Sequence, residues 1–231
     1  MTQSDHRLKV IYEDNHLLVV SKPAMLPTMG VDHDRPSLLS VAKEYIREKY
    51  DKPGNVYLGI VSRLDAPVTG VVLMARTSKA ASRLSEAFRK RDVEKTYWAV
   101  VDGMPDEPEG TLEHYLRKDE RHRKVHVTHA GSEGAQLARL SYKLVSKSND
   151  KSLLEIQLET GRKHQIRVQL AKIGLPILGD FKYGCQAQFP EGIALHAIST
   201  SVKHPVRDEI MTFKAKIPKS WRNQRTVARL V

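Results

Sequence analysis

The chain has little of what several common kinds of site need. Cysteine occurs once in 231 residues, at Cys185, so an intramolecular disulfide and a cysteine-based zinc site are both excluded. No apolar run approaches the roughly 18 residues of a membrane helix, and the polar N-terminus lacks the apolar segment of a secretory signal. Neither nucleotide-binding glycine pattern is present, nor is a Gly-x-Ser-x-Gly elbow. We therefore expect a soluble protein of the cytoplasm that has no membrane partner.

Acidic residues are also fewer than basic residues. Asp and Glu total 27 against 38 Lys and Arg, which gives a formal net charge of +11. A surface of this charge attracts polyanions and speeds their encounter, so nucleic acid is the leading class of partner. A generally basic soluble protein is the alternative. The cations gather in residues 88–95 and 116–126 and in the last segment of the chain, where no acid follows Glu209.

Length and apolar content predict one folded domain. Hydrophobic residues make up 40% of the chain, which is enough for a core and too much for a disordered protein. A chain of 231 residues is long for one domain and short for two. We expect a single domain over residues 1–231. Its last part, residues 218–231, is a basic tail that either lies along phosphates or frays into solvent.

Hydrophobic periodicity predicts more strands than helices. Apolar residues recur at helical spacing after Pro36-Ser37, after Thr77-Ser78 and over residues 165–173. Short apolar or alternating runs predict strands, and "SKSND" predicts a hairpin turn. Because strands come in runs with few helices between them, we predict an α+β fold with a largely antiparallel sheet. The predicted strands cover residues 8–12, 17–21, 71–75, 96–101, 138–145, 152–159, 194–205 and 210–218, and residues 111–135 stay unassigned.

The unassigned segment holds four histidines but does not predict a metal site. Two of them have i, i+4 spacing, yet no acid stands between them as in a zinc-protease helix. The segment is also rich in cations, which opposes the binding of a divalent ion. We therefore predict no metal at His114, His122, His126 and His129.

The stretch "IVSRLDAPVTG" places an aspartate between two apolar runs. Asp65 is therefore expected near a strand end at the edge of the core, in a loop shaped by Pro67 and Gly70. A half-buried carboxylate needs a cation or hydrogen-bond donors, and Arg63 is close in sequence. A turn aspartate bonded to backbone amides is the plain structural alternative.

A second stretch, "ETGRKHQIRVQLAKIGLP", gathers cations where a strand ends and a helix begins. Arg162 and Lys163 fall in the loop or the first helical turn, where outward backbone amides help to make an anion site. Arg167 borders the apolar face of the helix. Its stem is therefore expected to be buried and its head aimed inward, where a guanidinium needs a carboxylate partner. A solvated basic helix face is the alternative.

A third stretch, "EKTYWAVVDG", opens a buried type of strand with Tyr97, which alone is typical of a core tyrosine. Taken in order, "RLDAPVTG", "KTYWAVV" and "TGRKHQIRVQL", followed by "GLPILGD" and "ALHA", resemble the RluA family of RNA pseudouridine synthases. The likeness runs from "IYEDNHLLVVSKPAML" to "LHA", which is most of the chain. Each piece alone is weak, but the ordered set at compatible spacing is specific.

The resemblance implies an isomerase that acts on structured ribosomal or transfer RNA and requires no cofactor or metal. A monomer is the default expectation. It implies a mixed sheet with flanking helices and a catalytic cleft across the middle, as in single-domain members without the N-terminal RNA-binding domain. The family's essential aspartate falls on Asp65, the tyrosine stacked against the target base on Tyr97, and the basic partner of the aspartate on Arg167. We expect the cations to hold RNA phosphates, and the candidates are Arg63, Arg89, Arg91, Arg162, Lys163 and His164.

The chain departs from the family pattern around the aspartate. The family's histidine before "RLD" is Ser62 here, and its "TSG" is Val68-Thr69-Gly70. Ala66 and Pro67 replace an often charged pair. These changes concern the RNA contacts around the motif more than the chemistry. Two alternatives stay open: a non-catalytic RNA-binding relative on the same scaffold, and a nucleobase glycosylase that hydrolyses rather than rejoins.

Overall fold

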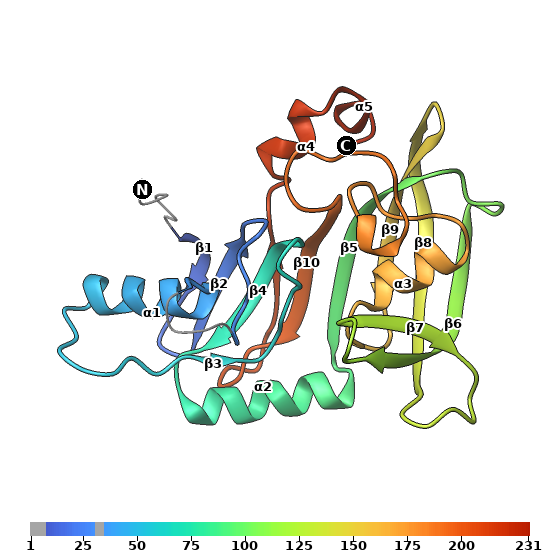
Figure 1. Cartoon of the computed structure of the whole chain (residues 1–231). Coiled ribbons are helices and arrows are strands. Elements are labelled where there is room, and N and C mark those ends of the chain that lie inside the picture. Colours follow the sequence, from blue (N-terminus) through green and yellow to red (C-terminus); the bar gives the residue numbers. More distant parts are fainter. Residues whose placement is uncertain (1–7, 31–34) are drawn as a thin grey trace. The chain divides into compact units, whose positions relative to one another are not determined.

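The structure is a computed structural model that describes residues 8–30 and 35–231 (Figure 1). Its contacts divide the chain into two compact units. The first unit holds residues 1–93 and 198–216, and the second holds residues 94–197 and 217–231. The prediction of one catalytic domain over the whole chain stays a prediction.

Antiparallel strand pairs build the first unit. β1 pairs with β2, β2 and the short β3 both pair with β4, and β10 pairs with β11. The predicted turn between the first two strands is confirmed, because the Asp14 N–H donates to the Leu17 carbonyl at 3.0 Å. The strands are β1 (Lys9–Glu13), β2 (Leu17–Lys22), β3 (Gly59–Ile60), β4 (Thr69–Ala75), β10 (Leu195–Lys203, which starts in the second unit) and β11 (Ile210–Lys214).

Helices cover both faces of β2 and β4. Successive side chains of a strand point to opposite faces. Leu18 and Val20 therefore enter the cluster that contains α1, whereas Leu17 and Val19 enter the cluster that contains α2. Every residue of β4 is buried, which confirms the prediction of a strand covered on both faces. The helices are α1 (Leu38–Lys49) and α2 (Ser78–Lys90).

Both helices begin where the sequence predicts. Ser37 is the N-cap of α1, and its hydroxyl accepts from the Ser40 N–H in a capping box with Ser40. Thr77 is the N-cap of α2 and accepts from the Ala80 N–H at 3.2 Å. Each cap satisfies one of the N–H groups that the first turn of a helix leaves without an intrahelical partner.

A run of antiparallel strands forms the second unit, in the spatial order β5-β9-β8-β6-β7. The hairpin between β8 and β9 is confirmed, but its turn is shorter than "SKSND". Strand β8 continues to Ser148, so only Asn149 and Asp150 turn, with Asn149 at φ +55°. The strands are β5 (Val93–Asp102), β6 (Glu109–Asp119), β7 (Lys124–Thr128), β8 (Gln136–Ser148) and β9 (Lys151–Leu158).

The unassigned segment of the sequence forms most of β6 and all of β7, which pair as a hairpin. These strands carry few apolar residues. In β6 only Leu116 is buried, and in β7 only Val125. Because polar side chains stand on both faces, the alternation that reveals a half-buried strand is weak here.

The predicted helix over residues 165–173 is confirmed as α3 (Gln165–Lys172), and the 3₁₀ turn η1 (Phe181–Tyr183) follows it. The C-terminal tail forms α4 (Lys219–Asn223) and α5 (Arg225–Ala228). Trp221 is fully buried and meets the rings of His196 and Phe189 edge-on, while Ser146 Oγ donates to the Leu230 carbonyl at 2.6 Å. The frayed-end alternative is therefore wrong, since Trp221 and Leu230 anchor the tail within the second unit.

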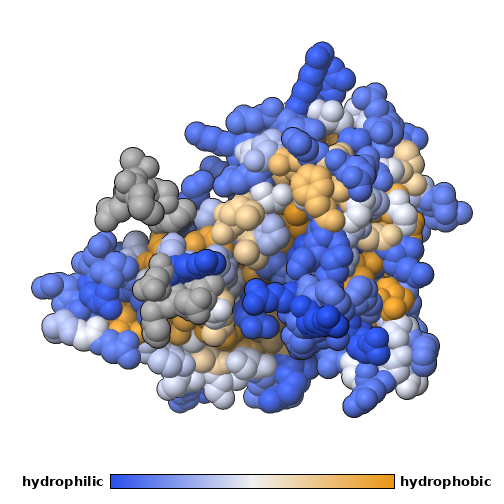
Figure 2. Space-filling model, in the orientation of Figure 1, coloured by the Kyte–Doolittle hydropathy of each residue, from blue (hydrophilic) through white to orange (hydrophobic). Residues whose placement is uncertain are grey.

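The prediction of an α+β fold with a mixed, largely antiparallel sheet and flanking helices is confirmed. Hydrophilic residues cover much of the face shown in Figure 2, and hydrophobic groups show between them. The predicted cleft across the middle of the sheet stays a prediction.

Candidate active site

Asp65 lies in the loop between β3 and β4 of the first unit. Its side chain is half-buried, and its carbonyl accepts from the Val68 N–H at 3.0 Å, which closes a turn. Pro67 fixes one backbone angle of that turn. The loop thus holds a carboxylate at the edge of the core, as the sequence predicts. Arg63, two residues earlier, is exposed.

A buried lysine anchors this loop from β2. Lys22 is 1% exposed, and its Nζ donates to the carbonyls of Pro23, Leu26 and Ala66 at 2.8, 2.7 and 2.9 Å. Three acceptors match the three N–H groups of an ammonium, whereas a neutral amine has only two. Burial lowers the pKa of Lys22 to about 7, and the charge of Asp65 opposes this change. Lys22 therefore ties the residue next to Asp65 to the loop after β2.

Two further polar contacts fix the same loop. Thr28 Oγ1 donates to the Leu64 carbonyl at 2.8 Å and accepts from the Leu64 N–H at 3.2 Å. Ser62 Oγ accepts from the Leu73 N–H of β4 at 3.0 Å, and Val68 is buried. The two main departures from the family pattern, Ser62 and Val68, thus have structural roles in this chain.

Tyr97 lies on β5 of the second unit, opposite Ile156 of β9, and is buried. Lys95 stands two residues earlier and so points to the same face of the strand. Burial lowers the pKa of Lys95, because desolvation disfavours the ammonium. The burial fits the plain reading of a core tyrosine, and contact between Tyr97 and a target base stays a prediction.

Arg167 is buried in the second unit with a carboxylate, which confirms the predicted inward orientation of its guanidinium. Its Nε donates to Asp180 Oδ2 at 2.7 Å, and its Nη2 donates to Asp180 Oδ1 at 2.8 Å. Arg167 is 5% exposed and Asp180 is 2% exposed. Bidentate pairs of this kind are among the stronger hydrogen-bonded contacts in proteins, and both partners are costly to leave alone. The solvated-face alternative is wrong.

Tyr183 of η1 contacts the guanidinium of this pair. Arg167 Cζ lies 5.1 Å from the centre of the Tyr183 ring, a cation–π distance. The Tyr183 hydroxyl accepts from the Val125 N–H at 3.0 Å and contacts His164 Nδ1 at 2.7 Å. One tyrosine therefore links β7, α3 and the loop that precedes α3.

The loop before α3 carries the predicted cations on a fixed backbone. Gln165 Oε1 accepts from Thr160 Oγ1 at 2.7 Å and from the Arg162 N–H at 3.0 Å. Arg162 and Lys163 are exposed, and Arg162 Nε donates to the Leu137 carbonyl at 3.0 Å. His164 caps the helix at φ +54°, a left-handed conformation that few non-glycine residues adopt.

The predicted site residues divide between the two units. Asp65 and Arg63 belong to the first, together with Arg89 and Arg91, which are exposed at the end of α2. Tyr97 and Arg167 belong to the second unit, with the loop of Arg162, Lys163 and His164. The structure brings Arg167 and His164 together around Tyr183. The meeting of Asp65 with Tyr97 and Arg167 stays a prediction.

Sequence reasoning missed Lys22, Asp180 and Tyr183. "GDFKYG" contains both residues of the second unit, but it matches neither nucleotide-binding glycine pattern, and no role was predicted for either residue. The available signal was the need of a buried Arg167 for a carboxylate, which an aspartate after the apolar run "LPIL" could meet. Lys22 gave no comparable signal, because lysine is almost never fully buried.

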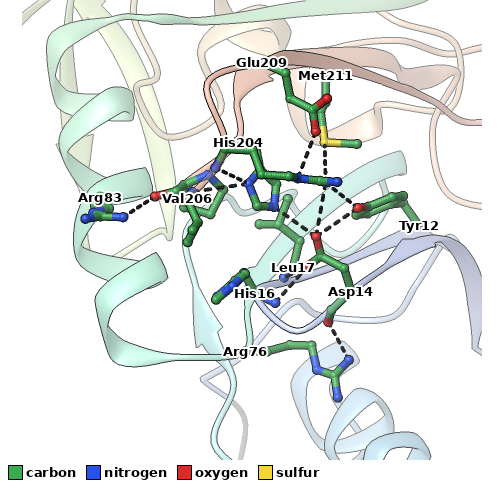
Figure 3. Close-up of polar contacts among 12 residues, drawn as sticks. Tyr12, Asp14, His16, Leu17, Arg76, Arg83, His204, Val206, Glu209 and Met211 are labelled. Atoms are coloured by element: carbon green, nitrogen blue, oxygen red, sulfur yellow. Dashed lines mark hydrogen bonds and ion pairs between the residues drawn. The ribbon is translucent and has the colours of Figure 1, made fainter.

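A second aspartate of the first unit, Asp14, lies in a cluster of hydrogen bonds that sequence reasoning missed as well. Figure 3 shows Tyr12 and His204 pointing toward Asp14. Asp14 accepts from the Tyr12 hydroxyl at 2.9 Å, from the His16 and Leu17 N–H groups at 2.7 Å, and from His204 Nε2 at 2.9 Å. Burial opposes its ionisation, but these donors outweigh burial and lower the pKa of Asp14 to about 2.

The tautomer of His204 follows from its neighbours. Its Nδ1 accepts from the N–H groups of Val206 and Arg207, so its Nε2 carries the proton that Asp14 accepts. The cluster ties the β1–β2 turn to the β10–β11 turn. Because Asp14 is saturated with donors, we interpret it as a structural residue.

The histidine-rich segment shows two histidines near one carboxylate rather than a ligand set. His122 Nδ1 lies 2.8 Å and His126 Nε2 lies 3.6 Å from Asp119 Oδ2, all on the β6–β7 hairpin. Within residues 8–30 and 35–231, no group of three or more His, Cys, Asp or Glu side chains could hold a metal ion. In the same ranges, no helix is long and apolar enough to span a membrane.

The fold places the chain in a class, that of the pseudouridine synthases. Human RNA Pseudouridylate Synthase Domain Containing 4 superposes with a TM-score of 0.77 at 26% identity, over 94% of this chain and 93% of that one. Human RNA Pseudouridylate Synthase Domain Containing 1 shares the fold, with a TM-score of 0.74 at 22% identity, over 94% and 86%. The predicted pseudouridine synthase fold is thus confirmed.

Sequence comparison gives the family. Residues 16–172 match the family model described as RNA pseudouridylate synthase, and the chain belongs to this family. The uncharacterized RNA pseudouridine synthase YhcT of Bacillus subtilis is 33% identical over 94% of this chain and 70% of its own length. The ribosomal large subunit pseudouridine synthase D of Vibrio cholerae is 32% identical over 93% and 68%. The chain spans about two thirds of each relative.

Proposed function

We propose that this protein isomerises specific uridines of ribosomal or transfer RNA to pseudouridine, with Asp65 as the catalytic carboxylate. The observation that most supports this role is the Asp65 loop. It lies inside the segment that matches the family and is anchored by the buried Lys22. We further propose that the protein works as a monomer in the cytoplasm.

The chemistry suits a single aspartate. Breaking the bond between ribose and uracil develops positive charge at carbon 1′, which a nearby carboxylate stabilises or traps, as in retaining glycoside hydrolases. Uracil leaves as a delocalised anion, so no second carboxyl group is needed to protonate it. The base then turns and rejoins the sugar through carbon 5. Tyr97 is proposed to stack against the base and help remove the proton from carbon 5.

Arg167 is proposed to be the basic partner of the Asp65 carboxylate. A guanidinium has five N–H groups, more than one carboxylate takes up, and in this chain Asp180 accepts from Nε and Nη2. Asp180 would fix the orientation of Arg167, and the Tyr183 ring would fix its plane. In this scheme Asp180 and Tyr183 are positioning residues.

The RNA is proposed to bind through exposed cations of both units and through the half-buried His164. Arg63, Arg89 and Arg91 come from the first unit, and Arg162, Lys163 and His164 come from the second. The target base must leave its stack before Asp65 reaches its sugar. Arg63 is proposed to fill the gap that the base leaves. Contacts to phosphates should make binding weaken steeply with salt.

Mapping pseudouridines in cellular RNA with and without this gene tests the proposal. We expect one or a few ribosomal or transfer RNA positions to lose pseudouridine and to regain it when purified protein is added. Release of free uracil would instead favour a glycosylase. RNA binding without any product would favour a non-catalytic relative. Each of these two results would contradict the proposed isomerase.

A further inference from the structure

An exposed aromatic side chain stands beside the Arg167–Asp180 pair. Phe181 directly follows Asp180 and is 60% exposed, whereas the other large aromatic residue of the turn, Tyr183, lies over Arg167. Single exposed apolar residues are common on protein surfaces, so exposure alone carries no meaning. Phe181 is distinguished by the hydrogen bonds that hold its neighbours and by the cations on nearby segments.

Hydrogen bonds hold the backbone of Phe181 and the side chains of its neighbours. The Phe181 N–H donates to the Gly179 carbonyl at 3.0 Å, and the Gly184 N–H donates to the Phe181 carbonyl at 3.3 Å. The side chains before and after it in the turn, Asp180 and Tyr183, are bound to Arg167 and His164. The phenyl ring is therefore displayed on a rigid support, which reduces the entropy lost when a ligand covers it.

Cations lie on η1 and on two segments of the second unit that contacts join to η1. Lys182 Nζ donates to the Arg123 carbonyl at 2.9 Å, which joins the β6–β7 turn to η1. The contact between His164 and Tyr183 joins the loop before α3 to η1. Residues 119–124, 160–164 and 181–184 together hold six cations against two acids. The cations are Arg121, Arg123, Lys124, Arg162, Lys163 and Lys182.

We propose that Phe181 is a stacking platform for an unpaired RNA base next to the target uridine. Every base has a π-face that stacks on an aromatic ring, and cations on the neighbouring segments would hold the adjoining phosphates. The net positive charge of these segments favours RNA over an apolar protein partner. This inference rests on the proposed function, which it deepens by naming single-stranded RNA beside the target as what the surface recognises.

Binding of two short RNA probes tests the platform directly. One probe is a single-stranded ten-nucleotide oligouridine, and the other is a ten-base-pair RNA duplex. Binding of both is measured by fluorescence anisotropy over a range of salt concentrations. Phe181→Ala should weaken binding of the single strand by about tenfold, because a base loses its stacking partner. Phe181→Tyr should restore binding, and duplex binding should change little.

The salt dependence separates stacking from charge. Phe181→Ala should leave the slope of log affinity against log salt unchanged, because no phosphate contact is lost. A Lys182→Ala variant should instead make that slope shallower, by the amount that corresponds to about one phosphate contact. A matched control for lost apolar surface is Ile210→Ala, since Ile210 is 78% exposed on β11 of the first unit. It should bind both probes as the wild type does.

Several outcomes would overturn the platform. Stacking is contradicted if Phe181→Ala binds the single strand as tightly as Ile210→Ala does. It is also contradicted if Phe181→Ala loses the same affinity for the single strand and for the duplex. Phe181→Trp gives a second readout, because stacking of a base should quench its fluorescence, and an unchanged signal at saturation would contradict stacking. Since these readouts need no turnover, their failure leaves the isomerase untouched. Absence of pseudouridine formation by the wild type would instead remove the proposed function and leave the binding result standing.

Discussion

Two buried cations, one in each unit, are held in opposite ways. Lys22 of the first unit gives its N–H groups to three neutral backbone carbonyls. Arg167 of the second unit gives two N–H groups to the carboxylate of Asp180, and a tyrosine ring covers it. Both stand beside residues that the proposed chemistry uses: Lys22 next to the Asp65 loop, and Arg167 as the proposed partner of Asp65.

The two arrangements give the two cations different properties. Neutral carbonyls offset only part of the cost of burying a charge, so the pKa of Lys22 falls to about 7 and the group titrates near neutrality. An arginine does not lose its proton in a protein, and a paired carboxylate fixes its position. We therefore expect Lys22 to act as a pH-dependent anchor of a loop and Arg167 as a permanent charge.

Breaking the arginine pair should have the largest effect on stability. Arg167→Ala leaves the buried Asp180 without its partner, so the free energy of unfolding should fall by about 3–5 kcal/mol. Urea denaturation measures this loss. Lys172→Ala, an exposed change on the same helix, is the control and should stay within about 0.5 kcal/mol of the wild type.

A double variant sharpens the same comparison. Because removal of both partners leaves no lone buried charge, Arg167→Ala with Asp180→Ala should cost clearly less than the sum of the two single changes. Additive costs, or an Arg167→Ala protein as stable as Lys172→Ala, would contradict the account of a mutually dependent buried pair.

Removing the lysine should have the next largest effect. Lys22→Met leaves the carbonyls of Pro23, Leu26 and Ala66 without their donor, and the free energy of unfolding should fall by about 2–4 kcal/mol. The comparison is made by urea denaturation against Lys9→Met, which changes an exposed lysine of β1. Equal stability of the two variants would show that Lys22 does not anchor the loop.

The pH dependence of the Lys22 contribution follows from its lowered pKa. The unfolded chain keeps the proton up to pH 10.5, the ordinary value, whereas the folded chain loses it near pH 7. Between these values the unfolded state binds more protons, so the folded state gains stability as the pH rises. The stability gap between wild type and Lys22→Met should widen by about 1 kcal/mol per pH unit between pH 7.5 and 9.5. A gap that is constant or narrows would contradict the lowered pKa.

The smallest effect is expected from the ring beside Arg167. Tyr183→Phe keeps the cation–π contact but loses the hydroxyl that serves Val125 and His164, at a cost of about 1 kcal/mol. Tyr183→Leu should cost a further 0.5–2 kcal/mol, roughly, because the contact with Arg167 is lost as well. Thermal or urea unfolding of the two variants distinguishes them, and identical losses would exclude a contribution from the ring.

Most of the fold could be predicted from the sequence where one face or both faces of an element are apolar. The helical spacing of apolar residues in α1 and α2 and the capping residues Ser37 and Thr77 predict both helices, and the structure confirms them. Strands β6 and β7 could not be predicted, because charged and polar residues occupy both of their faces. The order of the C-terminus was also not predicted, since its many cations conceal the few buried residues that anchor it, such as Trp221 and Leu230.

The candidate site could be predicted only as separate residues. The local pattern predicts that Arg167 is buried and has a carboxylate partner. It does not identify Asp180, 13 positions along the chain, as such a partner. The polar roles of Lys22 and Asp14 depend on carbonyls and N–H groups that only the folded backbone supplies. Patterns of side chains carry little information about such contacts.

The most direct test of the whole account compares two aspartates of the first unit. Pseudouridine formation is measured in a single turnover on the mapped RNA for Asp65→Asn and for Asp14→Asn, with RNA binding measured in parallel. We predict that Asp65→Asn binds RNA as the wild type does and forms no detectable product, whereas Asp14→Asn is less stable but still active. Product formation by Asp65→Asn at a rate near that of the wild type would contradict the role of Asp65.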